Sequence, residues 1–172
     1  MTATESPAPH SGGFAPKILV FSTNNISDPG IDLAGSSHLH YSPTVMVITM
    51  PCTSGIRPDW ILYAIEQGFD GVFVASDGEE CAFLPDCAER SSHIMLQAQA
   101  LLEQHGHNPR RLKMAAVCSV CADPFVNHMA EFSKTLVELG PSSPGPATAS
   151  GPGAGDPEKG ASGAGESEEC AA

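Results

Sequence analysis

The sequence predicts an α/β fold with a small parallel sheet of about four strands and helices on its flanks. Two observations carry this class. Short apolar runs alternate along the chain with segments whose apolar residues recur at helical spacing. Each apolar run ends in a loop of small or polar residues, and Pro or Gly marks the helix ends. Strands that alternate with helices pair in parallel, because each helix returns the chain to the start of the next strand.

The clearest part of the pattern spans residues 45–81. An apolar run at its start ends in a Pro-Cys-Thr-Ser-Gly loop, and Pro58 then opens a helix, where its missing N–H costs nothing. The helix stops at Gly68, and a second apolar run follows. This unit predicts two parallel strands joined by a right-handed crossover. Cys52 and Cys81 each follow a strand end and are therefore expected at the same edge of the sheet.

The other elements show the same signatures. We predict a strand at 17–21, a helix from Ser27 through Leu33 and Leu39, a helix over 88–104, a strand over 112–117 and a last helix from Asp123 to Gly140. Ser27 or Asp28 can cap the first of these helices. That helix also contains Gly30 and Gly35, so it must rest on tertiary packing or lie close to another backbone. The whole pattern predicts a flavodoxin-like or Rossmann-like layered fold.

One folded domain is predicted at 16–141. Residues 1–15 and 142–172 are rich in Pro, Gly and Ser, and the second segment is an acidic tail, so both are expected to be disordered. The net charge of −12, with only eight Lys plus Arg, argues against nucleic acid and anionic membrane surfaces as partners. No apolar run is long enough to predict a membrane span, and no signal peptide is visible, so a cytoplasmic location is expected.

Five of the six cysteines lie in or just after loops that follow predicted strands, namely Cys52, Cys81, Cys87, Cys118 and Cys121. Parallel strands would bring these loops to one rim, where thiolates suit zinc or an iron–sulfur cluster. Structural disulfides are not expected in a cytoplasmic chain. The Cys118-X-X-Cys121 pair fits half of a metal site, a redox dithiol at a helix start or two ordinary small residues. Cys52 and Cys81 also fit buried apolar positions.

Other candidate motifs are weaker. Asp77, Glu79 and Glu80 form an acidic turn that is typical of a solvated loop. The sequence has no phosphate-binding glycine motif and no nucleophile motif of a hydrolase. No motif in the sequence therefore argues for a self-contained enzyme.

The chain resembles the MvhD/FlpD family, the delta iron–sulfur subunit that links a hydrogenase or formate dehydrogenase to heterodisulfide reductase. The similar pieces include PKILVF at 16–21, LHYSPTV at 39–45, MPC at 50–52, GFDGVFVAS at 68–76 and LLEQHGHNPRRL at 101–112. The resemblance covers about residues 16–141. It implies an accessory electron-transfer component of a hydrogenase- or heterodisulfide-reductase-like complex, with a [2Fe–2S] cluster and redox protein subunits as partners.

The resemblance also shows departures at the positions where the family carries cysteines. After the first strand the chain has Ser22, Thr23 and Ile26, and after the third strand Ser76 replaces one cysteine. Cys52 and Cys81 match family cysteines, so two thiolates of the usual set remain. A [2Fe–2S] cluster needs four ligands.

Three interpretations follow from these departures. Cys118 and Cys121 could join Cys52 and Cys81 in a rebuilt four-thiolate site, for a [2Fe–2S] cluster rather than zinc. Alternatively, the cluster is lost and the chain is a docking subunit of the same kind of complex. A third hypothesis is a small thiol redox protein that works through Cys118 and Cys121.

Overall fold

The structure, a computed structural model, describes residues 13–78, 81 and 84–143. It confirms the predicted α/β class. The four strands are β1 (Ile18–Thr23), β2 (Val45–Met50), β3 (Gly71–Ser76) and β4 (Leu112–Ala116). They form one sheet of order β2-β1-β3-β4, in which every pair is parallel. Most of the two segments expected to be disordered, residues 1–12 and 144–172, lies outside the described residues.

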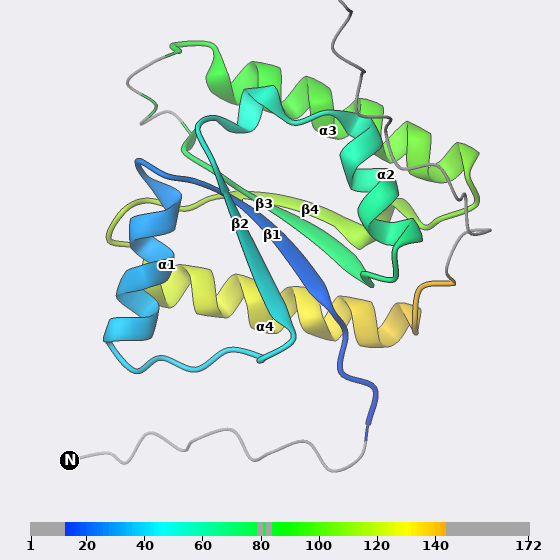
Figure 1. The fold of residues 1–172 in the computed structure, drawn as a ribbon, viewed down its shortest axis with the longest axis horizontal. Coiled ribbons are helices and arrows are strands. Elements are labelled where there is room, and N and C mark those ends of the chain that lie inside the picture. Colours follow the sequence, from blue (N-terminus) through cyan, green and yellow to red (C-terminus); the bar gives the residue numbers. More distant parts are fainter. Residues whose placement is uncertain (1–12, 79–80, 82–83, 144–172) are drawn as a thin grey trace, which may run out of the picture.

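Helices cover both faces of the sheet (Figure 1). One apolar core lies between the sheet and the pair α2 (Pro58–Glu66) and α3 (Cys87–Gln104). The other lies between the sheet and the pair α1 (Ser27–Ser36) and α4 (Ala122–Leu139). Two short 3₁₀ turns, η1 (Thr53–Gly55) and η3 (Pro109–Arg111), complete the elements of the described residues. The central strands β1 and β3 are buried along their whole length, because both of their faces are covered.

The strand order places a topological switch point between β1 and β3. From β1 the chain crosses through α1 to β2 at one edge, and from β3 it crosses through α3 to β4 at the other edge. The two connections therefore leave the carboxyl ends of these central strands in opposite directions. In open α/β sheets, the place where neighbouring connections diverge in this way is the usual place for a ligand.

The element ends follow the sequence signals, with one exception. Pro58 begins α2, and Gly68, Gly106 and Gly140 have positive φ just beyond α2, α3 and α4. The exception is α1, which ends at Ser36 and does not reach Leu39. Neither Ser27 nor Asp28 caps it, since Ile26 is the residue before the first turn and makes no side-chain cap. The side chain of Ser27 turns instead toward the strand ends.

Gly30 explains why a helix with two glycines forms here. A side chain at this position would overlap the backbone carbonyl of Cys118, which lies against α1. The prediction that this helix lies close to another backbone is therefore confirmed at Gly30. Gly35 has open space around it. Among the described residues, none of the helices is both long and apolar enough to cross a membrane.

Candidate functional site at the carboxyl rim

The switch point is filled by a buried hydrogen-bond network. Thr23, at the end of β1, donates its hydroxyl hydrogen bond to the carboxylate of Asp77, which follows β3. Ser27 lies beside them, 3.1 Å from the Thr23 hydroxyl, and donates to the carbonyl oxygen of Ala75 at 2.9 Å. Thr23 and Ser27 are fully buried and Asp77 is only 6% exposed. The expectation of a solvated acidic turn is therefore wrong for Asp77, while Glu79 and Glu80 lie outside the described residues.

A second set of hydroxyls continues this network along the rim. Ser22 donates to Asp28 at 2.9 Å, and Thr49 of β2 donates to the same carboxylate oxygen at 3.1 Å. Ser76 donates a longer bond, 3.4 Å, to the carbonyl oxygen of Ala115. Buried hydroxyls need such partners, since an unpaired one costs about 1–3 kcal/mol. Each hydroxyl at a position where the resembled family carries cysteine therefore already has a partner within the protein.

Three thiols meet on the α2/α3 side of the rim. Cys52 follows β2, and Cys87 is the first residue of α3. Their sulfur atoms are 4.0 Å apart, and Cys81 lies near enough to the Cys87 thiol to raise its pKa. Cys87 is buried, at 2% exposure, whereas Cys52 and Cys81 are half-buried. We name these three residues the thiol cluster.

Two buried hydroxyls, those of Thr53 and Ser91, lie beside the thiol cluster. Thr53 lies 4.0 Å from the Cys87 sulfur and 3.0 Å from the hydroxyl of Ser91, one turn further along α3. Burial is the largest of the effects that raise the pKa of Cys87 to about 11, and the neighbouring thiols Cys81 and Cys52 contribute to the same rise. Burial disfavours the charged thiolate, and Cys52 disfavours a second negative charge beside it. Cys87 is therefore a neutral thiol at pH 7.

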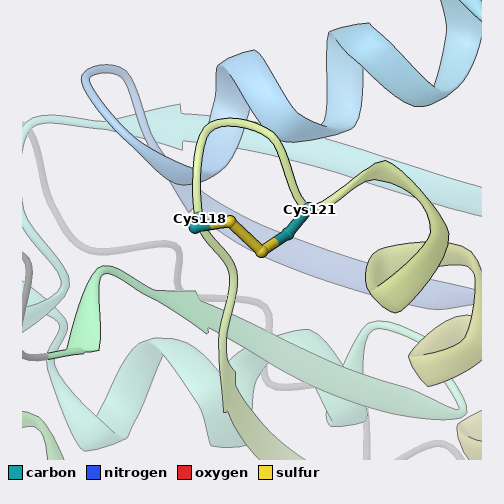
Figure 2. Close-up of a disulfide and its surroundings, with 2 residues drawn as sticks. All are labelled: Cys118 and Cys121. Carbon is teal, nitrogen blue, oxygen red and sulfur yellow. A yellow bond between two sulfur atoms is a disulfide. The ribbon is translucent and has the colours of Figure 1, made fainter.

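Cys118 and Cys121 lie elsewhere on the rim and are joined in a disulfide, with their Cα atoms 4.9 Å apart. Figure 2 shows the bond closing the short loop between β4 and α4. Both cysteines are half-buried, and Val120 between them is 76% exposed. The sequence did not favour a disulfide here, since a cytoplasmic setting was expected. The pair is local, three residues apart, so the turn before α4 is enough to bring the sulfurs together.

The four predicted metal ligands thus fall into two groups. Cys52 and Cys81 belong to the thiol cluster near β2 and α3, and Cys118 and Cys121 are bonded to each other beyond β4. Within the described ranges, no group of three or more His, Cys, Asp or Glu side chains is arranged to hold a metal ion. The four-thiolate site remains a prediction.

The sequence analysis placed Cys87 at the rim but not among the ligands. It lies 35 residues from Cys52, so no spacing motif connects the two, and only the packing of α3 against η1 shows the contact. The signal that could have found it is the position of Cys87 at a helix start on the same rim.

Together these features define a small doubly wound α/β domain with hydroxyl and sulfur groups gathered at its carboxyl rim. The chain belongs to the family described as methyl-viologen-reducing hydrogenase, delta subunit, which matches residues 18–140. The match runs from β1 to just beyond the end of α4 and so includes every described element.

Two kinds of curated relative support this assignment. The first is an iron–sulfur subunit of the F420-non-reducing hydrogenase of Archaeoglobus profundus, to which the chain is 29% identical over 131 residues, covering 73% of this chain and 92% of that protein. The second is a subunit of the ferredoxin:CoB-CoM heterodisulfide reductase of Methanosarcina mazei, to which the chain is 30% identical over 127 residues, covering 73% of this chain. The chain spans only 16% of the length of that second relative.

Proposed function

We propose that the chain is an accessory, non-catalytic subunit of a redox complex of the hydrogenase or heterodisulfide reductase type. The observation that carries this proposal is the family match over residues 18–140, the whole described fold. The names of the relatives, a hydrogenase iron–sulfur subunit and a heterodisulfide reductase subunit, support the same kind of complex. Formate dehydrogenase is a further partner that the family resemblance suggests.

The residues do not fit the family's [2Fe–2S] cluster at its usual place. Such a cluster needs four ligands, normally thiolates. Ser22, Thr23 and Ser76 offer neutral hydroxyls, and each already donates a hydrogen bond within the protein. We therefore derive no electron-transfer step through a cluster at that place. The form of the function that the described residues support is a docking subunit that keeps the fold and lacks this cluster.

A rebuilt cluster on Cys52, Cys81, Cys118 and Cys121 is the alternative form of the same function. It requires reduction of the Cys118–Cys121 disulfide and movement of two rim loops toward each other. The strands β2 and β4, which carry these loops, are separated by three strand spacings, about 14 Å. The docking form needs neither change.

The test is the metal content and spectrum of the full chain, purified anaerobically with its co-expressed neighbouring redox subunits. We expect colourless protein, without stoichiometric iron or zinc, that still co-purifies with a large redox subunit. About two iron atoms per chain with visible absorption, lost in Cys118→Ser and Cys121→Ser as well as in Cys52→Ser, would establish the rebuilt cluster instead. Failure to co-purify with any redox subunit would refute the subunit role itself.

A second candidate function, from a different class, is a small thiol redox protein. The observation that favours it is the disulfide at the start of the 18-residue helix α4, where the helix dipole stabilises a thiolate. The test is the maleimide reactivity of Cys118 in Cys121→Ser, and of Cys121 in Cys118→Ser, as a function of pH. A thiol pKa well below 8.5 in one variant supports this function, and values near 8.5 in both exclude it.

A further inference from the structure

The thiol cluster brings together a protected thiol and a more accessible one. Cys87 is buried at the first turn of α3, under the loop that carries Cys52 and beside Thr53. Cys52 is half-buried, and its sulfur lies 2.9 Å from the hydroxyl of Ser54 and 4.0 Å from the sulfur of Cys87. A dissolved reagent therefore reaches Cys52 before Cys87. The Cys87 sulfur is then close enough to attack an adduct that has formed on the Cys52 sulfur.

The separation of these two sulfur atoms suits a disulfide that can form and be reduced again. A disulfide needs the sulfur atoms near 2.05 Å, so the pair must close by about 2 Å from its separation of 4.0 Å. Cys52 lies in an extended residue before the short turn η1, and Gly55 in that turn has open space around it. Rotation of the two side chains with a small shift of this loop can supply the movement, whereas the backbone of Cys87 is held by its helix.

We propose that Cys52 and Cys87 form a reversible disulfide by thiol–disulfide exchange with a low-molecular-weight disulfide, and that Cys52 reacts first. Cys52, as thiolate, attacks one sulfur of R–S–S–R, so a Cys52–S–S–R bond forms and one RS⁻ leaves. Cys87, as thiolate, then attacks the Cys52 sulfur, so the Cys52–Cys87 bond forms and the second RS⁻ leaves. The two protons lost by the cysteines end on two R–SH molecules. Two protein thiols are oxidised by two electrons and one disulfide is reduced.

This exchange is independent of the proposed subunit function, and it changes what the rim can bind. In the oxidised state Cys52 is no longer available as a thiolate ligand. The sulfur of Cys87 lies 4.0 Å from that of Cys52, so we expect the Cys52–Cys87 bond to form without Cys81.

The test uses the full chain with Cys118, Cys121 and Cys170 changed to Ser, so that only the thiol cluster can react. The protein is incubated with oxidised glutathione, trapped with N-ethylmaleimide, digested and mapped by mass spectrometry. We expect a Cys52–Cys87 linked peptide as the main product, and its loss after treatment with dithiothreitol. A main link that includes Cys81, or the absence of any link in folded protein, would overturn the proposal.

Two single variants test the order of the steps. In Cys87→Ser the second step is blocked, so the glutathione adduct on Cys52 should rise about tenfold over the parent protein. In Cys52→Ser the buried Cys87 should remain without an adduct, and an adduct there would refute the order. Cys81→Ser should leave the link intact. A cooperative thermal unfolding transition shows that each of these variants, and Cys87→Ala, is folded. When the parent protein is oxidised in urea, the Cys52–Cys87 link must be lost, because it depends on the folded structure.

Discussion

The two groups of cysteines at this rim differ in how the fold brings them together. Cys118 and Cys121 are three residues apart, and the turn before α4 alone places them at bonding distance. Cys52 and Cys87 are 35 residues apart, and they meet only because α3 packs against η1 over the sheet. The first pair depends on local structure and the second on the tertiary fold.

The rim between these groups is occupied by hydroxyls and carboxylates. Thr23 and Asp77 close the switch point between β1 and β3, and Cys52 and Cys118 follow the two edge strands, β2 and β4. Side chains that follow parallel strands therefore share an edge of the sheet without sharing a site. Strand order and the residues at the central strands decide which of them meet.

The largest difference between the two groups of cysteines is expected in how much a disulfide in each group stabilises the folded protein. A disulfide between Cys52 and Cys87 closes a long loop of the unfolded chain, which the chain-entropy description values at roughly 3–4 kcal/mol. The Cys118–Cys121 bond closes a loop of only a few residues, so its reduction should cost roughly 1–2 kcal/mol. Urea unfolding of protein with each bond present alone and with both reduced measures the two values. Equal stabilisation by the two bonds would contradict this difference.

The network between the groups should be the next most sensitive feature. Thr23→Val keeps the shape of the side chain but leaves the buried carboxylate of Asp77 without its donor and the Ser27 N–H without an acceptor. We expect a loss of about 2–4 kcal/mol of unfolding free energy, measured by urea denaturation.

The matched control for this variant is Thr135→Val, because the half-buried Thr135 donates a solvent-exposed hydrogen bond to a helix carbonyl. We expect that change to cost less than about 0.5 kcal/mol. A Thr23→Val protein as stable as the control would show that the switch point is not held together by this network.

The contact between α1 and the Cys118 loop can be tested with a pair of glycines in one helix. Gly30→Ala places a Cβ against the carbonyl oxygen of Cys118, so we expect a loss of about 1–3 kcal/mol. Gly35→Ala meets open space and should stabilise the protein by up to about 1 kcal/mol, through helix propensity. Urea denaturation compares the two variants, and a shift of the same sign in both would show that α1 does not rest on this loop.

The parts of this fold that could be predicted from sequence are those set by local signals. Apolar runs located the strands, and Pro58, Gly68 and Gly106 lie where the helix ends were expected. The cap of α1 was predicted wrongly because the hydroxyl of Ser27, a good capping residue by type, bonds Thr23 and Ala75 instead. The bond to Ala75 depends on β3, 48 residues away, and no local pattern shows it.

The candidate site shows the same limit. The sequence placed its cysteines at one rim but could not give strand order, so it could not show that Cys52 and Cys118 follow strands at opposite edges. For the same reason it placed Cys87 at the rim without showing its contact with Cys52, which depends on the packing of α3. Predicting which edge of the sheet carries the cysteines therefore does not predict which of them come into contact.

The smallest expected effect is a pH dependence that only the thiol cluster should show. Burial and the neighbouring thiols raise the pKa of Cys87 from 9.0 to about 11 in the folded protein, so the unfolded chain loses this proton first as the pH rises. Between these two values the unfolded state is favoured progressively, and the stability that is complete below pH 9 declines as the pH approaches 11. The disulfide-bonded Cys118 and Cys121 have no thiol proton to lose. We expect the melting temperature of protein with a reduced thiol cluster to fall more steeply from pH 8 to 11 in the parent than in Cys87→Ala. The variant Cys118→Ala/Cys121→Ala should follow the parent. Parallel curves for the parent and Cys87→Ala would show that Cys87 is not held as a buried neutral thiol.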